Sequence, residues 1–416
     1  MVKWLIVAAL VIAPLRSTAT SLLIPMDQAQ QNHLKAYGWV YWSLKQDHPV
    51  EWLLNYRGGS FLTDYSQALE NECTVRGITY EIVTAEAVNK LLLDINRPSS
   101  NTNLVRLERA ARIGVYSPKN ELIQDETDAV IAVLDYAEIP YRIFYDEEIL
   151  HDSLSRFEWV HLHHEDFTGQ HGRFMRRESA ITQRQLQEIT ANQFGFAKVS
   201  QMKLEVAKRI KAYCANGGYL FAMCSGAETL DIALAANGID ISESVYDGDE
   251  VDPEAQEKLD FSKTLAFENF TLEYEGRKFS DINSGSSRPN YWETPNTYFR
   301  LFGYSAKWDI IPSMLNQNHE QVIREFHGQT SCFNKFLIKP QVEILGENTA
   351  DNRVRYIADE LGRGHWTFYS GHDPEGTGGG GPNRRTDLSL YPHSPGYRLI
   401  LNNVLFPSAR KKKQKT

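Results

Sequence analysis

Cys224 is the residue of this chain whose neighbours most favour nucleophilic chemistry. It follows the apolar run 219–223, which predicts a buried strand, and it precedes a helical pattern that begins at Ser225. Ala222 and Gly226, two residues to either side, are small enough for the tight turn that exposes a nucleophile between a strand and a helix. The positive end of the helix dipole would lower the pKa of a thiol placed there. We therefore expect a thiolate nucleophile, with a buried structural cysteine as the alternative.

Two further predicted strands also end in polar residues. Residues 159–163 run into His164, Glu165 and Asp166, and residues 365–369 run into the segment 370–375, which contains His372, Asp373 and Glu375. Ligands of an open parallel sheet bind outside the carboxyl ends of its strands. The three strand ends should therefore bring these side chains together with Cys224.

The histidines of the first of these strand ends also permit a metal site. His161 and His163 alternate along the strand and so share one face, and Glu165 follows them; His171 could add a ligand. The alternative is that these histidines are polar residues at the edge of the sheet. We favour that alternative and expect no metal or cofactor, while a metal-assisted hydrolase on His161, His163 and Glu165 stays open. The glycine-rich segment 376–381 lacks the Lys-Ser/Thr of a phosphate-binding loop and could act as a lid over the site.

The elements that must position these residues form an α/β pattern. From Arg112 onward, strands of about five residues alternate with helices of about ten to fifteen, which is typical of βαβ units. We expect a flavodoxin-like or Rossmann-like parallel sheet with helices on both faces over residues 110–408, closed by a helix at 395–405. Residues 240–345 lack a clean period and predict an insertion of hairpins and loops. Residues 26–106 predict a small N-terminal α/β subdomain, and 101–103 a linker.

The N-terminal residues suggest export. Residues 1–20 carry Lys3, then an apolar run and small residues, as in a secretory signal peptide, and the run is too short to span a bilayer. We expect a periplasmic or extracellular protein without a transmembrane segment. The net charge of -9 makes nucleic acid a poor partner, although residues 409–416 form a basic tail. The four cysteines show no CxxC spacing, so a zinc ribbon is not supported.

A family resemblance adds roles to these residues. The elbow Ala222-Met-Cys224-Ser-Gly226, followed near the C-terminus by His372-Asp-Pro-Glu375, resembles the class I glutamine amidotransferase superfamily, whose motifs read GxCxG and HPE. It covers roughly residues 110–240 and 355–405. The resemblance implies that Cys224 is the nucleophile, His372 the general base and Glu375 its orienting carboxylate. Ala222 replaces the first glycine and Asp373 is an additional residue, so either Asp373 or Glu375 could orient His372.

Two narrower resemblances accompany it. Gly362-Arg-Gly364 and the aromatic strand after it look like the trehalose-utilisation (ThuA-like) branch of the same fold. The whole chain, including segments 32–37, 54–59 and 395–407, also resembles an exported bacterial family labelled asparagine synthetase B. The residues do not support that reaction. Val2 follows Met1, the first cysteine is Cys73, and the SGGxDS loop that binds ATP is absent.

The resulting hypothesis is a cysteine hydrolase or amidotransferase-like enzyme that acts on an amide or related acyl group. The N–H of Ser225 would hold the oxyanion with a second donor from the turn that ends at Gly169, and Gly226 and Glu165 would also line the substrate site. A non-catalytic module that binds a carbohydrate or peptide is the alternative, consistent with 8 Trp and 20 Tyr. The sequence leaves the oligomeric state open.

Overall fold

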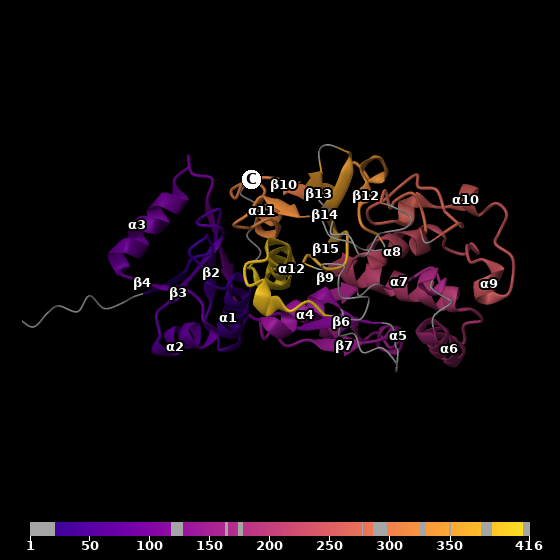
Figure 1. Ribbon diagram of the computed structural model, residues 1–416, viewed down its shortest axis with the longest axis horizontal. Helices are drawn as coiled ribbons and strands as arrows, with labels where there is room; N and C mark the ends of the chain where they lie inside the picture. The colour runs from indigo at the N-terminus through magenta and orange to yellow at the C-terminus, as the bar shows by residue number, and fades with distance from the viewer. Residues whose placement is uncertain are drawn as a thin grey trace, which may run out of the picture.

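The computed structural model describes residues 21–117, 128–162, 165–173, 178–276, 278–285, 298–324, 330–348, 351–375 and 385–410. The predicted signal peptide, the glycine-rich segment 376–381, His163 and His164, and the tail beyond Arg410 lie outside the described residues. Two sheets organise the chain: a five-stranded sheet near the N-terminus and a ten-stranded sheet beside it (Figure 1). The protein is therefore a mixed α/β structure.

The N-terminal sheet is antiparallel, with strand order β4-β1-β3-β2-β5. Its strands are β1 Ser21–Ile24, β2 Val50–Leu54, β3 Ser60–Asp64, β4 Glu81–Val83 and β5 Asn103–Leu107, and its helices are α1 His33–Lys45, α2 Gln67–Arg76 and α3 Ala85–Asn96. One face buries Trp52 and Phe61 against Tyr37 of α1, while the other face packs Leu53 and Leu62 against α3. The expected linker at 101–103 is wrong, because Asn103 begins β5 and pairs with Leu54 of β2.

The larger sheet is parallel in one half and antiparallel in the other, in the order β11-β10-β13-β14-β15-β9-β8-β6-β7. The parallel strands are β6 Ile113–Tyr116, β7 Arg142–Phe144, β8 Trp159–Leu162, β9 Tyr219–Met223 and β15 Gly364–Tyr369. The antiparallel strands are β10 Tyr298–Leu301, β11 Val322–Arg324, β13 Glu343–Asn348 and β14 Arg353–Leu361, and β12 Phe333–Asn334 pairs with β14.

The antiparallel half is a departure from the expected parallel sheet. No helix lies between β13, β14 and β15, and Gly362 (φ 61°) with Arg363 turns the chain from β14 into β15. Parallel strands need a crossover of a dozen or more residues, whereas a tight turn joins only antiparallel neighbours. The short connections therefore impose the antiparallel pairing.

Helices cover both faces of the larger sheet. On one face lie α4 Ala129–Tyr136 and α12 Pro395–Leu405; on the other lie α5 Asp146–Leu150, α7 Val199–Ala215 and α8 Ser225–Ala235. The other helices are α6 Glu178–Gln193, α9 Ser244–Asp247, α10 Ala255–Lys258 and α11 Ile310–Leu315. Among the described residues, no helix combines the length and apolar character that crossing a membrane requires.

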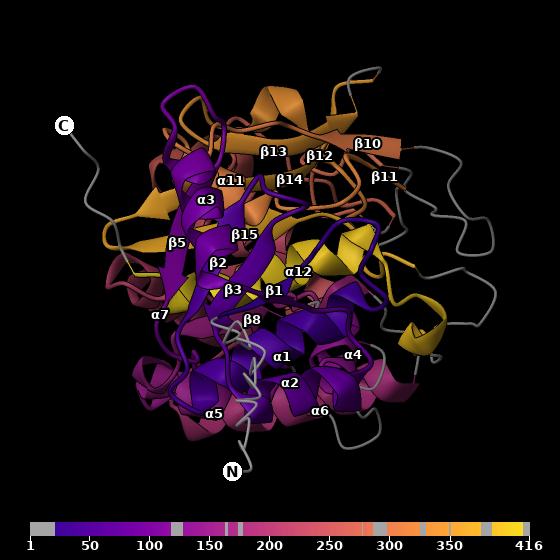
Figure 2. The same cartoon turned by 90° about the vertical axis from the view of Figure 1, so that its left-hand side faces the viewer.

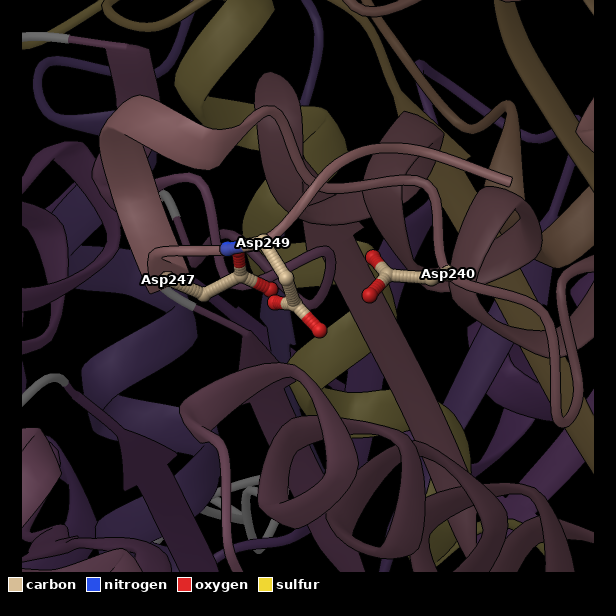
Figure 3. Close-up of side chains that lie close together, drawn as sticks. All are labelled: Asp240, Asp247 and Asp249. Atoms are coloured by element: carbon tan, nitrogen blue, oxygen red, sulfur yellow. The ribbon is translucent and has the colours of Figure 1, made fainter. Parts of the chain in front are cut away.

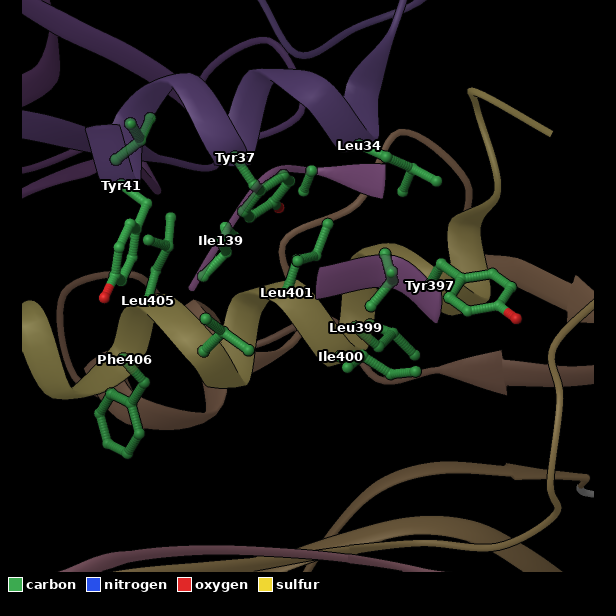
Figure 4. Packing of buried hydrophobic residues seen from close by; sticks show 14 of the residues in the cluster. Leu34, Tyr37, Tyr41, Ile139, Tyr397, Leu399, Ile400, Leu401, Leu405 and Phe406 are labelled. Atoms are coloured by element: carbon green, nitrogen blue, oxygen red, sulfur yellow. The ribbon is translucent and has the colours of Figure 1, made fainter. Parts of the chain in front are cut away.

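Helix α12 joins the two sheets. In Figure 2 the N-terminal sheet and α1 stand in front of α12, and Figure 4 shows Leu34, Tyr37 and Tyr41 of α1 facing the apolar side chains of α12. The Tyr37 hydroxyl donates a hydrogen bond to Oδ1 of Asn402. The buried Arg398 guanidinium donates to the carbonyl oxygen of Gly58 at 2.7 Å. Because apolar burial and buried hydrogen bonds act together, the N-terminal unit is fixed to the helix that closes the larger sheet.

Candidate functional site

Cys224 occupies a tight turn between β9 and α8. Its backbone has φ 54° and ψ -134°, a combination that is sterically unfavourable for a residue with a Cβ atom. Its N–H donates to the carbonyl oxygen of Tyr369 in the neighbouring β15 at 3.3 Å. The first two N–H groups of α8, those of Ser225 and Gly226, have no acceptor among the described residues. The turn therefore holds the thiol beside two free donors, although only 3% of Cys224 is exposed.

The two small residues on either side of Cys224, Ala222 and Gly226, have different surroundings in the structure. Ala222 lies in the centre of the sheet and is paired with Leu162 on one side and Phe368 on the other. A Cβ atom added to Gly226 would lie 3.5 Å from Leu162 and 3.6 Å from the backbone nitrogen of Glu165, which are ordinary contact distances. Close packing therefore does not by itself require glycine at position 226.

The segment that carries His372 leaves the sheet beside Cys224. Tyr369, the last residue of β15, is in register with Met223, the last residue of β9. Gly371 then turns with φ 89°, and its N–H donates to the carbonyl oxygen of Thr330 at 2.9 Å. The half-buried His372 follows this turn. The parallel register therefore brings the two motifs of the sequence to neighbouring strand ends.

Asp373 holds the turn after His372 in shape. Its Oδ1 accepts hydrogen bonds from the Tyr397 hydroxyl at 2.7 Å and from the N–H of Glu375 at 2.9 Å, and its Oδ2 accepts one from the Thr386 hydroxyl. Glu375 is largely buried, and this burial raises the pKa of its carboxyl although the Ser394 hydroxyl favours the anion. Both carboxylate oxygens of Asp373 thus accept hydrogen bonds that hold the turn. Glu375 is therefore the better candidate to orient His372.

Glu228 is a site residue that the sequence analysis did not find. It lies one helical turn after Cys224 in α8 and is fully buried. Its carboxylate accepts hydrogen bonds from the hydroxyls of Ser280 at 2.8 Å and Thr330 at 2.5 Å. Burial raises the pKa of Glu228 to about 7, which is the range of acid–base groups. The signal was a glutamate four residues after the cysteine, one turn along the helix that follows it.

Glu165 belongs to a buried polar cluster at the carboxyl ends of β6 and β8. The Lys203 ammonium lies 2.9 Å from Oε1 of Glu165, 2.9 Å from Oδ2 of Asp146 and 2.9 Å from the Tyr116 hydroxyl. All four side chains are buried. Burial raises the pKa of Glu165 to about 7 despite the ammonium, because Asp146 shares that ammonium. Glu165 is thus anchored to α7 through Lys203.

Two of the three N–H groups in the turn expected to supply a second oxyanion donor are already engaged. The N–H of Phe167 donates to the Thr229 hydroxyl at 3.3 Å, and the N–H of Thr168 donates to Oδ1 of Asp166 at 2.8 Å. Gly169 has φ 80°, and an added Cβ atom would lie 2.8 Å from the backbone of Ser200. The turn packs onto α7 and α8, so neither the Phe167 nor the Thr168 N–H is available to a substrate.

His161 makes structural contacts at both ring nitrogens. Nε2 lies 3.2 Å from Oδ2 of Asp128, and Nδ1 lies 3.1 Å from the carbonyl oxygen of Phe221. The imidazole stacks with Trp159 on the face covered by α4, whereas Glu165 is bound on the face covered by α7. These contacts give His161 and Glu165 separate surroundings. The metal hypothesis that also uses His163 stays a prediction, since His163 lies outside the described part of the chain.

Within the described ranges, one group of side chains could hold a metal ion by proximity alone. It consists of Asp240, Asp247 and Asp249, which Figure 3 shows with their carboxylates converging. The Lys198 ammonium lies among them, 3.2 Å from Oδ2 of Asp247 and 2.5 Å from Oδ1 of Asp249, and it also pairs with Asp240. An ammonium at this point already neutralises part of the acidic charge. The cluster is therefore explained as an ion-pair network.

Comparisons with known proteins assign no family to the chain. No family model matches it, and no curated protein matches it in sequence. Among solved structures, two proteins from Salmonella typhimurium titled as cytoplasmic have TM-scores of 0.37 and 0.33 at 11% and 10% identity. Each alignment covers 72% of this chain and 100% and 99% of those proteins. A β-galactosidase from Bacillus circulans sp. alkalophilus has a TM-score of 0.26 at 12% identity, over 68% of this chain and 32% of that enzyme. Similarities this distant carry no argument about function.

Proposed function

We propose that the protein is a cysteine-dependent hydrolase or amidotransferase-like enzyme that acts on an amide or related acyl group at Cys224. The observation that carries this proposal is the backbone of Cys224, with φ 54° and ψ -134° at the start of an 11-residue helix. A residue other than glycine keeps such a conformation only where its surroundings impose it, and such positions cluster at active sites. The strand–turn–helix context is the one in which a nucleophile elbow functions.

The proposed reaction proceeds by acyl transfer to sulfur. His372 takes the thiol proton, and the sulfur electron pair forms a bond to the acyl carbon while the carbonyl π electrons move to oxygen. The N–H of Ser225 donates to that oxyanion. When the carbonyl re-forms, the C–N bond breaks and the amine leaves with the proton from His372. Water then cleaves the thioester, again with His372 as base, and releases the acid.

The proposal extends to fold type and location. The strand order β15-β9-β8-β6-β7, with helices on both faces, supports a flavodoxin-like arrangement of the parallel half. We place the protein in the periplasm or outside the cell because residues 1–20 read as a signal peptide. A small amide, a peptide or a carbohydrate derivative is the proposed substrate class.

A non-catalytic binding module on the same scaffold is the second candidate. The observation in its favour is the burial of Cys224, of which only 3% is exposed. Such a module would keep the turn as an inherited structural element without using the thiol.

Thiol reactivity separates the two candidates. Purified protein is treated with iodoacetamide between pH 5 and 9, and alkylation of each cysteine is followed by peptide mass spectrometry. Cys214 serves as the internal control, because burial raises its pKa to about 12. The enzyme proposal expects Cys224 to alkylate faster than a free model thiol near pH 7 while Cys214 stays unmodified.

Substrate turnover provides the second measurement. Wild-type protein and Cys224→Ser are compared on a panel of amides and p-nitrophenyl esters, and only the wild type is expected to accumulate a thioester. If Cys224 alkylates no faster than the model thiol and no ester acylates it, the enzyme proposal is abandoned in favour of the binding module.

A further inference from the structure

Acyl transfer at Cys224 requires more hydrogen-bond donation than the N–H of Ser225 supplies. An oxyanion hole commonly combines two donors, and removing one of them reduces the rate strongly. The N–H groups of Phe167 and Thr168 already have acceptors. The hydroxyls of Ser280 and Thr330 are also engaged, since both donate to the Glu228 carboxylate. The N–H of Gly226 stays free of any described acceptor beside the thiol, and a side-chain hydroxyl at the elbow would add a further donor to these two backbone groups.

Ser370 carries a buried hydroxyl at the strand end next to Cys224. It is fully buried, and its Oγ has no hydrogen-bond partner among the residues that the structure describes. Its own backbone is held in place, because its N–H donates to the carbonyl oxygen of Arg355 at 2.8 Å. A buried hydroxyl without a hydrogen-bond partner destabilises the folded state, so it calls for an explanation.

The position of Ser370 relative to Cys224 supplies that explanation. Tyr369 and Met223 are register partners in the parallel pair β15–β9, and Ser370 and Cys224 are the residues that follow them. Neighbouring strands lie about 4.8 Å apart, so one small acyl group can contact the side chains at both strand ends. The hydrogen bond from the Cys224 N–H to the Tyr369 carbonyl oxygen keeps these two ends together.

We propose that the Ser370 hydroxyl is a catalytic residue that donates a hydrogen bond to the oxyanion formed at Cys224, together with the N–H of Ser225. This inference rests on the proposed function. The Ser370 proton stays on Oγ throughout, and the negative charge on the substrate oxygen comes from the electron pair of the thiolate. In this proposal the Ser370 hydroxyl donates its hydrogen bond only when the tetrahedral intermediate forms. The bond therefore stabilises the transition state more than the resting enzyme.

Two chemical probes test this role, because only one of them forms an oxyanion. Acylation of Cys224 by p-nitrophenyl acetate passes through a tetrahedral intermediate, whereas alkylation by iodoacetamide does not. Ser370→Ala should slow acylation about 100-fold to 1,000-fold, the usual effect of losing one oxyanion donor. Its alkylation rate should stay within about twofold of wild type, and Ser370→Thr should recover part of the acylation rate because it keeps the hydroxyl.

Ser408→Ala is the matched control. Ser408 is also buried with an unpartnered hydroxyl among the described residues, but it lies after α12, next to the N-terminal sheet. This variant should match wild type with both probes. If Ser370→Ala acylates as fast as wild type, or if acylation and alkylation fall together, the assignment of Ser370 is overturned while the nucleophile stands. If wild-type Cys224 is neither acylated nor alkylated faster than a model thiol, the proposed function itself fails, and the Ser370 role fails with it.

Discussion

Replacement of Cys224 by glycine should give a more stable protein than replacement by alanine. Both variants lose the thiol, so the comparison isolates the Cβ atom in a turn with φ 54° and ψ -134°. Relief of this conformation is worth about 1–3 kcal/mol. The extra freedom of glycine in the unfolded chain returns about 0.5–1 kcal/mol. The net expectation is a free energy of unfolding about 1 kcal/mol higher for Cys224→Gly than for Cys224→Ala.

Urea unfolding followed by tryptophan fluorescence measures this difference, because Trp159 and Trp366 are buried in the strands on either side of β9. Ala227→Gly, three residues along in α8, is the control. The same exchange inside a helix should destabilise by about 1 kcal/mol. If Cys224→Ala proves as stable as Cys224→Gly while the Ala227 control shows its usual loss, the turn is not strained. The observation that carries the proposed function would then be refuted.

Three further predictions concern buried charges. Burial lowers the pKa of His33 to about 2 and that of His319 to about 3, so below pH 6.5 the unfolded chain takes up protons that the folded protein refuses. Stability should fall by about 1.4 kcal/mol per pH unit for each histidine, and His33→Gln should remove one proton from the slope of unfolding free energy against pH. Lys203→Met should cost about 3–5 kcal/mol at pH 8, measured by urea unfolding, because it leaves two buried carboxylates without their cation. Burial raises the pKa of Glu228 to about 7, so the neutral carboxyl stabilises the folded protein fully below pH 4.5, and this stabilisation of about 3 kcal/mol is lost by pH 7. A Glu228→Gln variant whose free energy of unfolding depends on pH in the same way as that of wild type would contradict this.

Residues with a local signature could be read from the sequence. The apolar run 219–223 became β9 with those bounds, and α12 spans the expected 395–405, because a short buried strand and a proline-started helix are encoded by consecutive side chains. The same holds for Cys224, whose small neighbours and strand-to-helix context lie within five residues. The antiparallel strands β13 and β14 were missed because charged residues interrupt their apolar pattern, such as Arg355 and Glu347, and the cation that pairs with Glu347, Lys335, lies 12 residues away in the chain.

The rest of the site depends on residues that are distant in the chain. That Glu228 is buried follows from Ser280 and Thr330, which arrive 52 and 102 residues later. The Ser370 hydroxyl has no hydrogen-bond partner among the described residues, and the residues next to it in the chain could not have predicted this. The local pattern around Cys224 is enough to propose a nucleophile at that position. The groups that surround it follow from the fold, because desolvation and hydrogen-bond partners are set by the packing of segments that are distant in the chain.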